Sequence, residues 1–475
     1  MGPDLLEEIT RELNGLLKDG VVSKIHEPDG RTLVFKVFTR GKTEELVISA
    51  HPRFSRIHIS SREFKNPEAP PRFAAYLRSR ILNARMEAFE QAQGERIVRI
   101  RLIKKIDGEW SALVLIAELT GKSSNIILCD SEGVVLDALR HFGPGSAREV
   151  YPGVALPPLP PPPPMKEAPI EKKEDETWNE AADRSYSALL DEEWLALEKN
   201  RLRRVITEAC KKAERKLRNL KGDESRALNG LQYESLGEIL RSNYGKLKRG
   251  MKEIEADDYT VYPPEKVHIA LDEKLGPKEN LDKFFKRAKR AKTALSLLRG
   301  RIPEVEKELE YLASLMYEWE SIETKGDLSG LRDELMKEGY IKEKAAAAPR
   351  EEERATPVRR YTSTEGFEIL CGKSGAGNDL IVKEYAKDED IWFHAAKIPG
   401  SHVLIKTAGR AKELTKKTIE EAASICAYYS KAREASKVEV IYTEARHVKK
   451  PRGAKPGMVT VREYKSILVR PKAEI

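Results

Sequence analysis

A cluster of aromatic and imidazole side chains near the C-terminus is the part of this sequence best suited to chemistry. Within thirteen positions the chain places Asp390, Trp392, Phe393, His394, Pro399, Gly400, Ser401 and His402. Aromatic rings can stack on nucleobases, and imidazoles can donate or accept hydrogen bonds. In a strand, Trp392 and Phe393 would point to opposite faces, so one ring is predicted to face outward as a stacking platform. The competing interpretation is that both rings are core residues.

The residues around this cluster do not form the pattern of a metal site or of a catalytic site. Neither of its histidines has a carboxylate or thiolate at zinc-ligand spacing, and the Ser-His pair at 401–402 has no acid to complete a triad. The triplet Gly372-Lys373-Ser374 resembles part of a phosphate-binding loop. The glycine required five positions earlier is replaced by Phe367. We therefore expect no metal and no cofactor, and predict that the chain is not an enzyme.

Positive charge is concentrated in the segment that follows. Between residues 446 and 472 the sequence has nine Lys or Arg and one acidic residue, against a net charge of +8 for the whole chain. The rest of the chain is thus close to neutral. A proline-containing loop in this segment carries Lys449, Lys450, Arg452 and Lys455, with no acid between residues 447 and 462. Solvated loops usually mix charges, so this pattern favours contact with phosphates over a plain surface loop.

The composition indicates the class of protein and the compartment in which it is expected. Charged residues make up 34% of the 475 positions, and the four cysteines form no C-x-x-C pair, which favours reduced thiols over a disulfide framework. No apolar run approaches the roughly 20 residues of a membrane span, and the first residues do not resemble a signal peptide. We expect a cytoplasmic protein.

Hydrophobic periodicity and turn signals predict an α+β multidomain chain. Residues 1–156 are predicted to form a β-rich α+β domain, with helices at 5–17 and 73–82. Its strands are expected at 21–26, 32–38, 45–50, 56–60, 96–103, 110–119, 125–128 and 134–138. A polyproline stretch opens a linker over residues 157–183.

A helical region follows the linker. Apolar residues recur in steps of three and four from Leu281 to Trp319, the spacing of a heptad seam. Together with a first arm after residue 184, this predicts a long antiparallel coiled-coil hairpin over residues 184–341. A distal cap is expected at about 223–280, with a strand at 266–271. A second linker at 342–358 and a compact C-terminal α+β domain at 359–475 complete the prediction.

Several motifs resemble the NFACT family, whose members act in ribosome quality control. In the C-terminal domain these are Ser363-Thr-Glu-Gly366, Gly377-Asn378-Asp379, the 390–394 and 399–403 runs, and Lys455-Pro456-Gly457. In the N-terminal domain they are Ser49-Ala50-His51-Pro52, Arg56-Ile57-His58 and Lys122-Ser123-Ser124-Asn125. The resemblance implies an NFACT-N domain, a coiled-coil arm and an NFACT-R RNA-binding domain.

The resemblance also implies the partners. Members of the family bind an obstructed large ribosomal subunit with peptidyl-tRNA and recruit a tRNA, in bacterial members alanyl-tRNA, for untemplated C-terminal tailing of the stalled chain. An Asp-Arg pair that contacts tRNA in the family corresponds here to Glu95-Arg96. Ser123, Ser124 and Asn125 are further expected RNA contacts. Too little sequence separates the polyproline stretch from the first arm to hold the family's helix-hairpin-helix module, so the chain is identified as a shortened member.

Two other functions are weighed against this one. Relatives also carry the older name of fibronectin-binding proteins, which leaves open a weak fibronectin partner or an adhesin. NFACT-N resembles the fold of DNA glycosylases that use an N-terminal proline as nucleophile. In this chain Pro3 lies behind Gly2 and would not become terminal when Met1 is removed. A third alternative is a generic RNA- or ribosome-binding factor without tailing activity.

Overall fold

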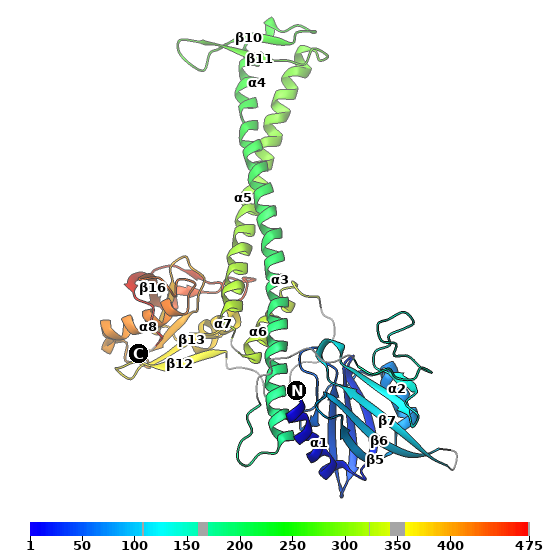
Figure 1. Cartoon of the computed structure of the whole chain (residues 1–475). Coiled ribbons are helices and arrows are strands. Elements are labelled where there is room, and N and C mark those ends of the chain that lie inside the picture. Colours follow the sequence, from blue (N-terminus) through cyan, green and yellow to red (C-terminus); the bar gives the residue numbers. More distant parts are fainter. Residues whose placement is uncertain (107–108, 160–169, 323, 343–356, 474–475) are drawn as a thin grey trace. The chain divides into compact units, whose positions relative to one another are not determined.

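The computed structural model describes residues 1–106, 109–159, 170–322, 324–342 and 357–473 (Figure 1). By its internal contacts the chain divides into two compact units, Met1–Trp194 and Leu195–Ile475. In the described ranges no helix is long and apolar enough to cross a membrane. Residues 160–169 of the predicted 157–183 linker and 343–356 of the second linker lie outside the described residues.

The first unit is built on one antiparallel sheet of nine strands. Its order is β4-β3-β2-β1-β5-β6-β7-β8-β9. The strands are β1 Val21–Asp29, β2 Thr32–Thr39, β3 Lys42–Ser49, β4 Arg56–Ile59, β5 Arg85–Gln91, β6 Ile97–Ile106, β7 Glu109–Glu118, β8 Asn125–Asp130 and β9 Val135–Ala138. Helices α1 (Pro3–Leu17) and α2 (Arg72–Ile81) place their apolar residues in the main core with one face of the sheet.

Strand β5 was not expected from the sequence, although it joins the two halves of the sheet between β1 and β6. Its pairing with β6 shifts register between Met86 and Ala88. The shift separates the buried Met86 and Phe89 by three positions instead of two. An alternating pattern is therefore absent from the sequence of this strand.

The long helix α3 (Trp178–Gly230) begins inside the first unit. Glu12 of α1 accepts hydrogen bonds from the backbone amides of Trp178 and Asn179, at 2.8 and 2.9 Å, and so caps this helix. Asp183 accepts a hydrogen bond of 2.5 Å from the Ser60 hydroxyl. Residues 178–183, predicted as the end of the linker, are thus helical and bonded to the N-terminal domain.

In the second unit, α3 continues beside α5 (Pro277–Glu320) to form a helical hairpin (Figure 1). Lys199 lies near Ile322, to whose carbonyl its ammonium donates at 3.0 Å, and Lys221 forms a 2.9 Å ion pair with Glu306. Rising numbers on α3 thus meet falling numbers on α5, and the helices are antiparallel. Most of the predicted seam of α5 is buried: Phe284, Ala288, Ala291, Leu298, Ile302, Val305 and Leu312.

The far end of the hairpin carries a small cap. Helix α4 (Gln232–Ser242) follows α3, and strands β10 (Glu253–Asp258) and β11 (Glu265–Ala270) pair antiparallel. Their apolar residues form a separate cluster with Phe284 of α5. The cap is shorter than the predicted 223–280, because α3 continues to Gly230 and α5 begins at Pro277, and β11 lies one residue earlier than the predicted strand.

The C-terminal domain contains a six-stranded antiparallel sheet of order β12-β13-β15-β14-β16-β19. The strands are β12 Val358–Thr362, β13 Glu368–Gly372, β14 Ile391–Ala395, β15 Val403–Lys406, β16 Val438–Glu444 and β19 Lys465–Val469. Helix α8 (Lys416–Tyr428) covers one face, while the short helix α7 (Gly375–Leu380) adjoins β13. Helix α6 (Lys325–Lys337) follows α5 and packs against it.

Candidate nucleic-acid interface

The prediction that Trp392 or Phe393 faces solvent is wrong. The two rings do point to opposite faces of β14, as strand geometry requires, but both faces are covered. Phe393 lies in the core beneath α8, and Trp392 lies in a second cluster on the other face with Leu404 and Val448. Their exposed fractions are 0% and 1%. Neither ring can serve as an open stacking platform.

Trp392 instead belongs to a compact group of rings. The Trp392 indole and the His394 imidazole, two positions apart on β14, are nearly parallel with centroids 5.8 Å apart. His402, just before β15, is almost perpendicular to both, with centroids 5.0 Å from Trp392 and 5.4 Å from His394. Burial lowers the pKa of His394 to about 4, and burial together with nearby His394 lowers the pKa of His402 well below its usual value. Both imidazoles are therefore neutral at pH 7.

Asp390 has a structural role, contrary to its prediction as an RNA contact. It is 1% exposed and forms an ion pair with Lys406. Its carboxylate accepts a hydrogen bond of 2.8 Å from the backbone amide of Thr407 and another of 2.8 Å from that of Lys387. The bonds to Lys406 and Thr407 thus fix the start of β14 against the end of β15, and the bond to Lys387 fixes the turn before β14.

The turn at residues 399–402 is fixed by close contacts with the end of α8. A Cβ atom at Gly400 would lie 2.9 Å from the Ser430 Cβ, so only glycine fits there without movement. The Ser401 amide donates to the Tyr429 carbonyl at 2.8 Å. On the other side, Asn378 accepts a hydrogen bond of 2.9 Å from the His402 amide. The turn therefore positions His402, and Asn378 is a support that we did not select from the sequence.

Only half of the basic loop is available for an external partner. The Lys450 ammonium lies 2.6 Å from each carboxylate oxygen of Asp379, and Lys455 pairs with Glu338. These acids are distant in the sequence, which is why the loop looked unpaired. Lys449 and Arg452 are exposed. The loop is closed by the short strands β17 (Val448–Lys449) and β18 (Thr460–Val461).

Two buried carboxyl groups connect the base of the helical hairpin to the C-terminal domain. Glu318 of α5 accepts a hydrogen bond of 3.1 Å from the Gly375 amide at the start of α7. Glu334 of α6 accepts one of 2.8 Å from the Tyr311 hydroxyl. Burial raises the pKa of Glu318 well above its usual range, with repulsion from Glu334 adding to it, and burial also raises the pKa of Glu334.

The predicted contacts of the N-terminal domain come together at one end of β6, β7 and β8. The register pairs Ile97 with Glu118, and Glu118 with Asn125, which brings residues 95–96 and 123–125 to the same end of the sheet. Glu95 and Ser123 are exposed, but Arg96, Ser124 and Asn125 are buried. The Asn125 amide bonds the Arg140 backbone at 2.9 Å in both directions, which makes it a structural residue.

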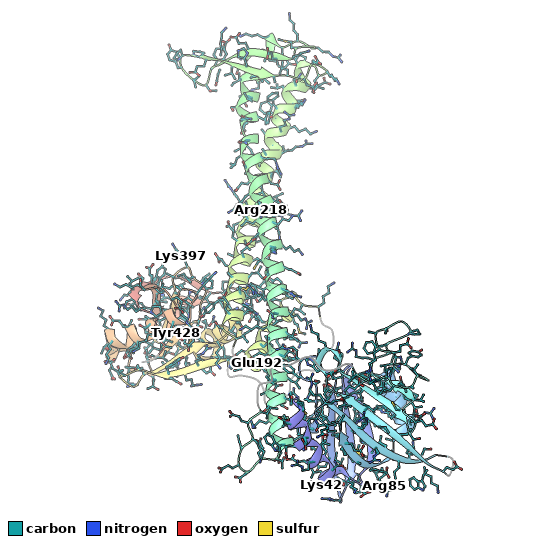
Figure 2. The ribbon with its side chains drawn as sticks, viewed as in Figure 1. Lys42, Arg85, Glu192, Arg218, Lys397 and Tyr428 are labelled. Carbon is teal, nitrogen blue, oxygen red and sulfur yellow. The ribbon has the colours of Figure 1, made fainter. Side chains whose placement is uncertain are left out.

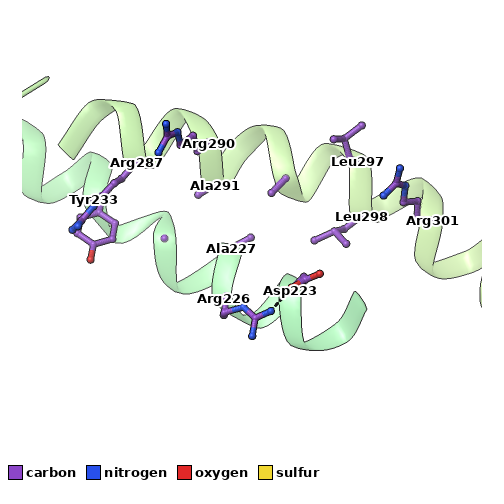
Figure 3. Close-up of a pocket in the computed structure, with 12 residues that line it drawn as sticks. Asp223, Arg226, Ala227, Tyr233, Arg287, Arg290, Ala291, Leu297, Leu298 and Arg301 are labelled. Atoms are coloured by element: carbon purple, nitrogen blue, oxygen red, sulfur yellow. Dashed lines mark hydrogen bonds and ion pairs between the residues drawn. The ribbon is translucent and has the colours of Figure 1, made fainter. Parts of the chain in front are cut away.

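The hairpin carries a basic surface that the sequence analysis missed. Residues 283–301 of α5 contain eight Lys or Arg and no acid, whereas residues 304–320 contain six Glu and one Lys. The positive charge of the first half and the negative charge of the second half nearly cancel in a sum over the helix, so a net charge does not reveal the basic surface. Figure 3 shows part of the basic half, where Arg287, Arg290 and Arg301 line a pocket shared with Arg226 and Asp223 of α3. Arg218 also lies on the hairpin (Figure 2).

Comparison with family models decides the identity of this architecture. The model of the NFACT N-terminal and middle domains matches residues 5–185 and 163–354, and that of the NFACT protein RNA binding domain matches residues 357–463. The chain belongs to the NFACT family. The part of the chain that matches the NFACT RNA binding domain contains the group of rings around Trp392, the 399–402 turn and the basic loop.

Relatives extend the NFACT match over nearly the whole chain. The "Rqc2 homolog RqcH" of Bacillus subtilis (strain 168) is 29% identical, with 98% of this chain and 97% of that protein covered. That match extends over 561 residues, more than the 475 of this chain, so the Bacillus protein contains residues without a counterpart here. The "Ribosome quality control complex subunit NEMF homolog" of Drosophila melanogaster is 34% identical over 82 residues, 17% of this chain and 8% of that protein.

A solved structure also matches in part. It is the C-terminal part of the fibronectin/fibrinogen-binding protein from Streptococcus suis, 26% identical. The match covers 58% of this chain and 96% of that chain with a TM-score of 0.45.

Proposed function

We propose that this NFACT protein is a ribosome quality control factor that binds obstructed large ribosomal subunits carrying peptidyl-tRNA. It recruits a tRNA, alanyl-tRNA in particular, for untemplated C-terminal tailing of the stalled chain. The near full-length similarity to a protein named RqcH supports the pathway, and the NFACT RNA binding domain supports RNA as the partner.

The observation that carries the proposal is the charge pattern of α5. A helix of 44 residues extends about 66 Å, a length suited to reaching across a large assembly. The basic half of α5, residues 283–301, lies next to the distal cap, and its buried apolar residues pack against α3 and α4. Two of the eight cations, Lys283 and Lys292, pair with Asp272 and Glu234 of the distal cap, and the other six are exposed over the same 19 positions. Such a surface favours the phosphate backbone of ribosomal RNA.

The second part of the proposal is that the protein positions its partners and catalyses no step. Peptide-bond formation between the nascent chain and the incoming aminoacyl-tRNA would be ribosomal chemistry. Holding a tRNA in place raises its effective concentration at the ribosome's own catalytic centre. Glu95 and Arg96 are the proposed tRNA contacts, and Ser123 lies at the same end of the sheet.

The tRNA part is tested by recovering tagged protein from growing cells and sequencing the bound RNA. Wild type is compared with Arg96→Ala, and with Arg99→Ala as a matched control at an exposed position of β6, the strand that begins directly after Arg96. We expect large-subunit ribosomal RNA from all three proteins, with one tRNA enriched in wild type and Arg99→Ala only. Because Arg96 is buried, thermal unfolding of each variant is measured in parallel.

The outcomes distinguish binding to the large ribosomal subunit from recruitment of a tRNA. Ribosomal RNA without an enriched tRNA in wild type would leave a subunit-binding factor that does not tail. Equal tRNA enrichment in Arg96→Ala would remove that residue from the contact. Absence of ribosomal RNA from the wild-type sample would contradict the proposed function.

A further inference from the structure

A cavity of about 520 Å³ lies inside the second unit, beside the sheet of the RNA-binding domain. Trp392, His394 and Ile441 line it from the sheet, His402 from the turn before β15, and Ser314 from α5. Its volume falls in the range of roughly 300–1,000 Å³ that is typical of ligand pockets. None of the contacts described above fills it.

Two polar atoms, in residues that line this cavity, have no hydrogen-bond partner in the part of the chain that the structure describes. They are the Trp392 Nε1 and the His402 Nδ1, both inaccessible to solvent, in side chains that are 1% and 2% exposed. Buried polar atoms without a partner cost free energy, and in native proteins they usually await a ligand or an ordered water. The indole can only donate, while the neutral imidazole nitrogen can donate or accept.

The wall around these two atoms is aromatic and uncharged. The stacked Trp392 and His394 rings and the perpendicular His402 ring form a right-angled corner. The Glu318 carboxyl group also lines the cavity, and an anion would gain no favourable interaction from it. The preferred ligand is therefore flat and neutral, with a hydrogen-bonding edge.

Two cationic side chains also line the cavity. They are Lys373 and the exposed Lys397, which Figure 2 labels. The second half of the basic loop contributes Gly457, Met458 and Val459 to the lining. The exposed Lys449 and Arg452 belong to the same loop, so phosphate-binding groups adjoin the cavity.

We propose that this cavity takes one unstacked nucleobase of an RNA, while the flanking phosphates remain outside on the basic loop. The inference rests on the proposed function, since it gives the RNA-binding domain a specific element to bind. Single-stranded or bulged nucleotides are the usual targets of base-specific RNA recognition, because their edges are free. Trp392 thus contacts a base by its indole N–H, inside the domain, and not as a surface platform.

The test uses the full-length chain and a fluorescent RNA hairpin with one bulged nucleotide. Four versions carry A, C, G or U in the bulge, and a fifth carries an abasic site at the same position. At least one base is expected to bind tenfold or more tightly than the abasic RNA in an anisotropy titration. Free AMP, CMP, GMP and UMP are titrated separately, and the signal of Trp392 is the difference in tryptophan fluorescence between wild type and Trp392→Phe, because the chain has five tryptophans.

Three variants locate the effect. Trp392→Phe keeps a ring but removes the donor, and is expected to reduce the preference for a base over the abasic site to below threefold. Ser314→Phe fills the cavity from α5 and leaves the sheet intact, so it tests the site even if Trp392→Phe unfolds. Arg452→Ala is the control: it should weaken all five RNAs equally and preserve their ratio.

The results distinguish this inference from the proposed function. Equal binding of all five RNAs by wild type would overturn the base pocket and leave RNA binding intact. Binding of free nucleotides without any base dependence among the RNAs would assign the cavity to a free nucleotide, which also overturns the proposal. If no RNA binds, the RNA-binding role of this domain fails as well.

Discussion

At the scale of single residues, Glu318 brings a carboxyl group into a setting that opposes its charge. It is 9% exposed and lies near the second buried carboxyl group, Glu334, so burial and repulsion both raise its pKa. An acid whose pKa is higher in the folded state than in the unfolded state stabilises the fold less as pH rises. The stabilising state is the protonated one. The loss begins at about the ordinary value of 4.5 and continues up to the folded-state pKa.

Glu318→Gln should therefore increase the free energy of unfolding at pH 8 and have little effect at pH 4.5. Each unit between the folded and unfolded pKa values corresponds to about 1.4 kcal/mol. The amide oxygen of Gln can still accept the Gly375 hydrogen bond. Urea unfolding at the two pH values measures the difference, and an equal effect at both would contradict the assignment.

The neighbouring lysines of the basic loop provide a second test. Lys450 is bonded to Asp379 and mostly buried, with 14% of its side chain exposed, whereas Lys449 is exposed. Lys450→Ala should destabilise the domain by about 1–3 kcal/mol, because Asp379 loses a charged partner. Lys449→Ala should leave the melting temperature unchanged and weaken RNA binding. Reversed effects in thermal melts and RNA titrations would show that the loop is arranged differently.

At the scale of elements, the sequence predicted most strands and helices of the first unit but not their surroundings. Eight of the first unit's strands follow alternation and turn signals, and β5 was missed because its bulge removes that alternation. The ring cluster was correctly placed on a strand. Its burial depends on α8 and on residues such as Val448, which lie far along the chain. Alternation along one strand carries no information about what covers each face.

The partners of the basic loop could not be predicted for the same reason. Asp379 and Glu338 are 71 and 117 positions from the lysines that they bind. A count of charges within a window detects neither pair. The basic half of α5 could have been found from the sequence, because its eight cations occupy the positions between the seam residues.

Two glycines test the packing of the hairpin. A Cβ atom at Gly230 would lie 2.8 Å from the Ala291 Cβ on α5. A Cβ atom at Gly300 would have no neighbouring atom within 4 Å among the described residues. Gly230→Ala is expected to destabilise the hairpin by about 1–3 kcal/mol through overpacking. Gly300→Ala should stabilise it by about 0.5–1 kcal/mol through helix propensity.

Circular dichroism during chemical unfolding measures both changes. The double variant Gly230→Ala/Ala291→Gly provides the control, since removal of the facing methyl group should restore part of the lost stability. Equal stabilisation by both alanines would mean that α3 and α5 do not approach each other at this point.

At the scale of the whole molecule, the chain joins an N-terminal NFACT domain, a helical hairpin and an RNA-binding domain. The charge of α5 is unevenly distributed along the hairpin: the cations lie toward the distal cap and the glutamates lie toward the base. The acids at the base serve the protein itself, since Glu318 caps α7 and Glu306 pairs with Lys221. Six of the eight distal cations are exposed and outside the Lys283–Asp272 and Lys292–Glu234 pairs, and a phosphate-rich surface is the partner that they fit best.

The most direct measurement is co-sedimentation of purified protein with purified large or small ribosomal subunits at two salt concentrations. Wild type is compared with Lys289→Glu/Arg290→Glu on α5. The control, Lys42→Glu/Arg85→Glu, makes the same charge change on the first unit (Figure 2), where weak surface pairs contribute little stability.

We expect wild type and the control to pellet with large subunits and not with small ones. The α5 variant should bind at least tenfold more weakly, and its affinity should depend less on salt because fewer counterions are released. Undiminished binding by the α5 variant, or equal pelleting of wild type with small subunits, would contradict the claim that this hairpin attaches the protein to the large subunit.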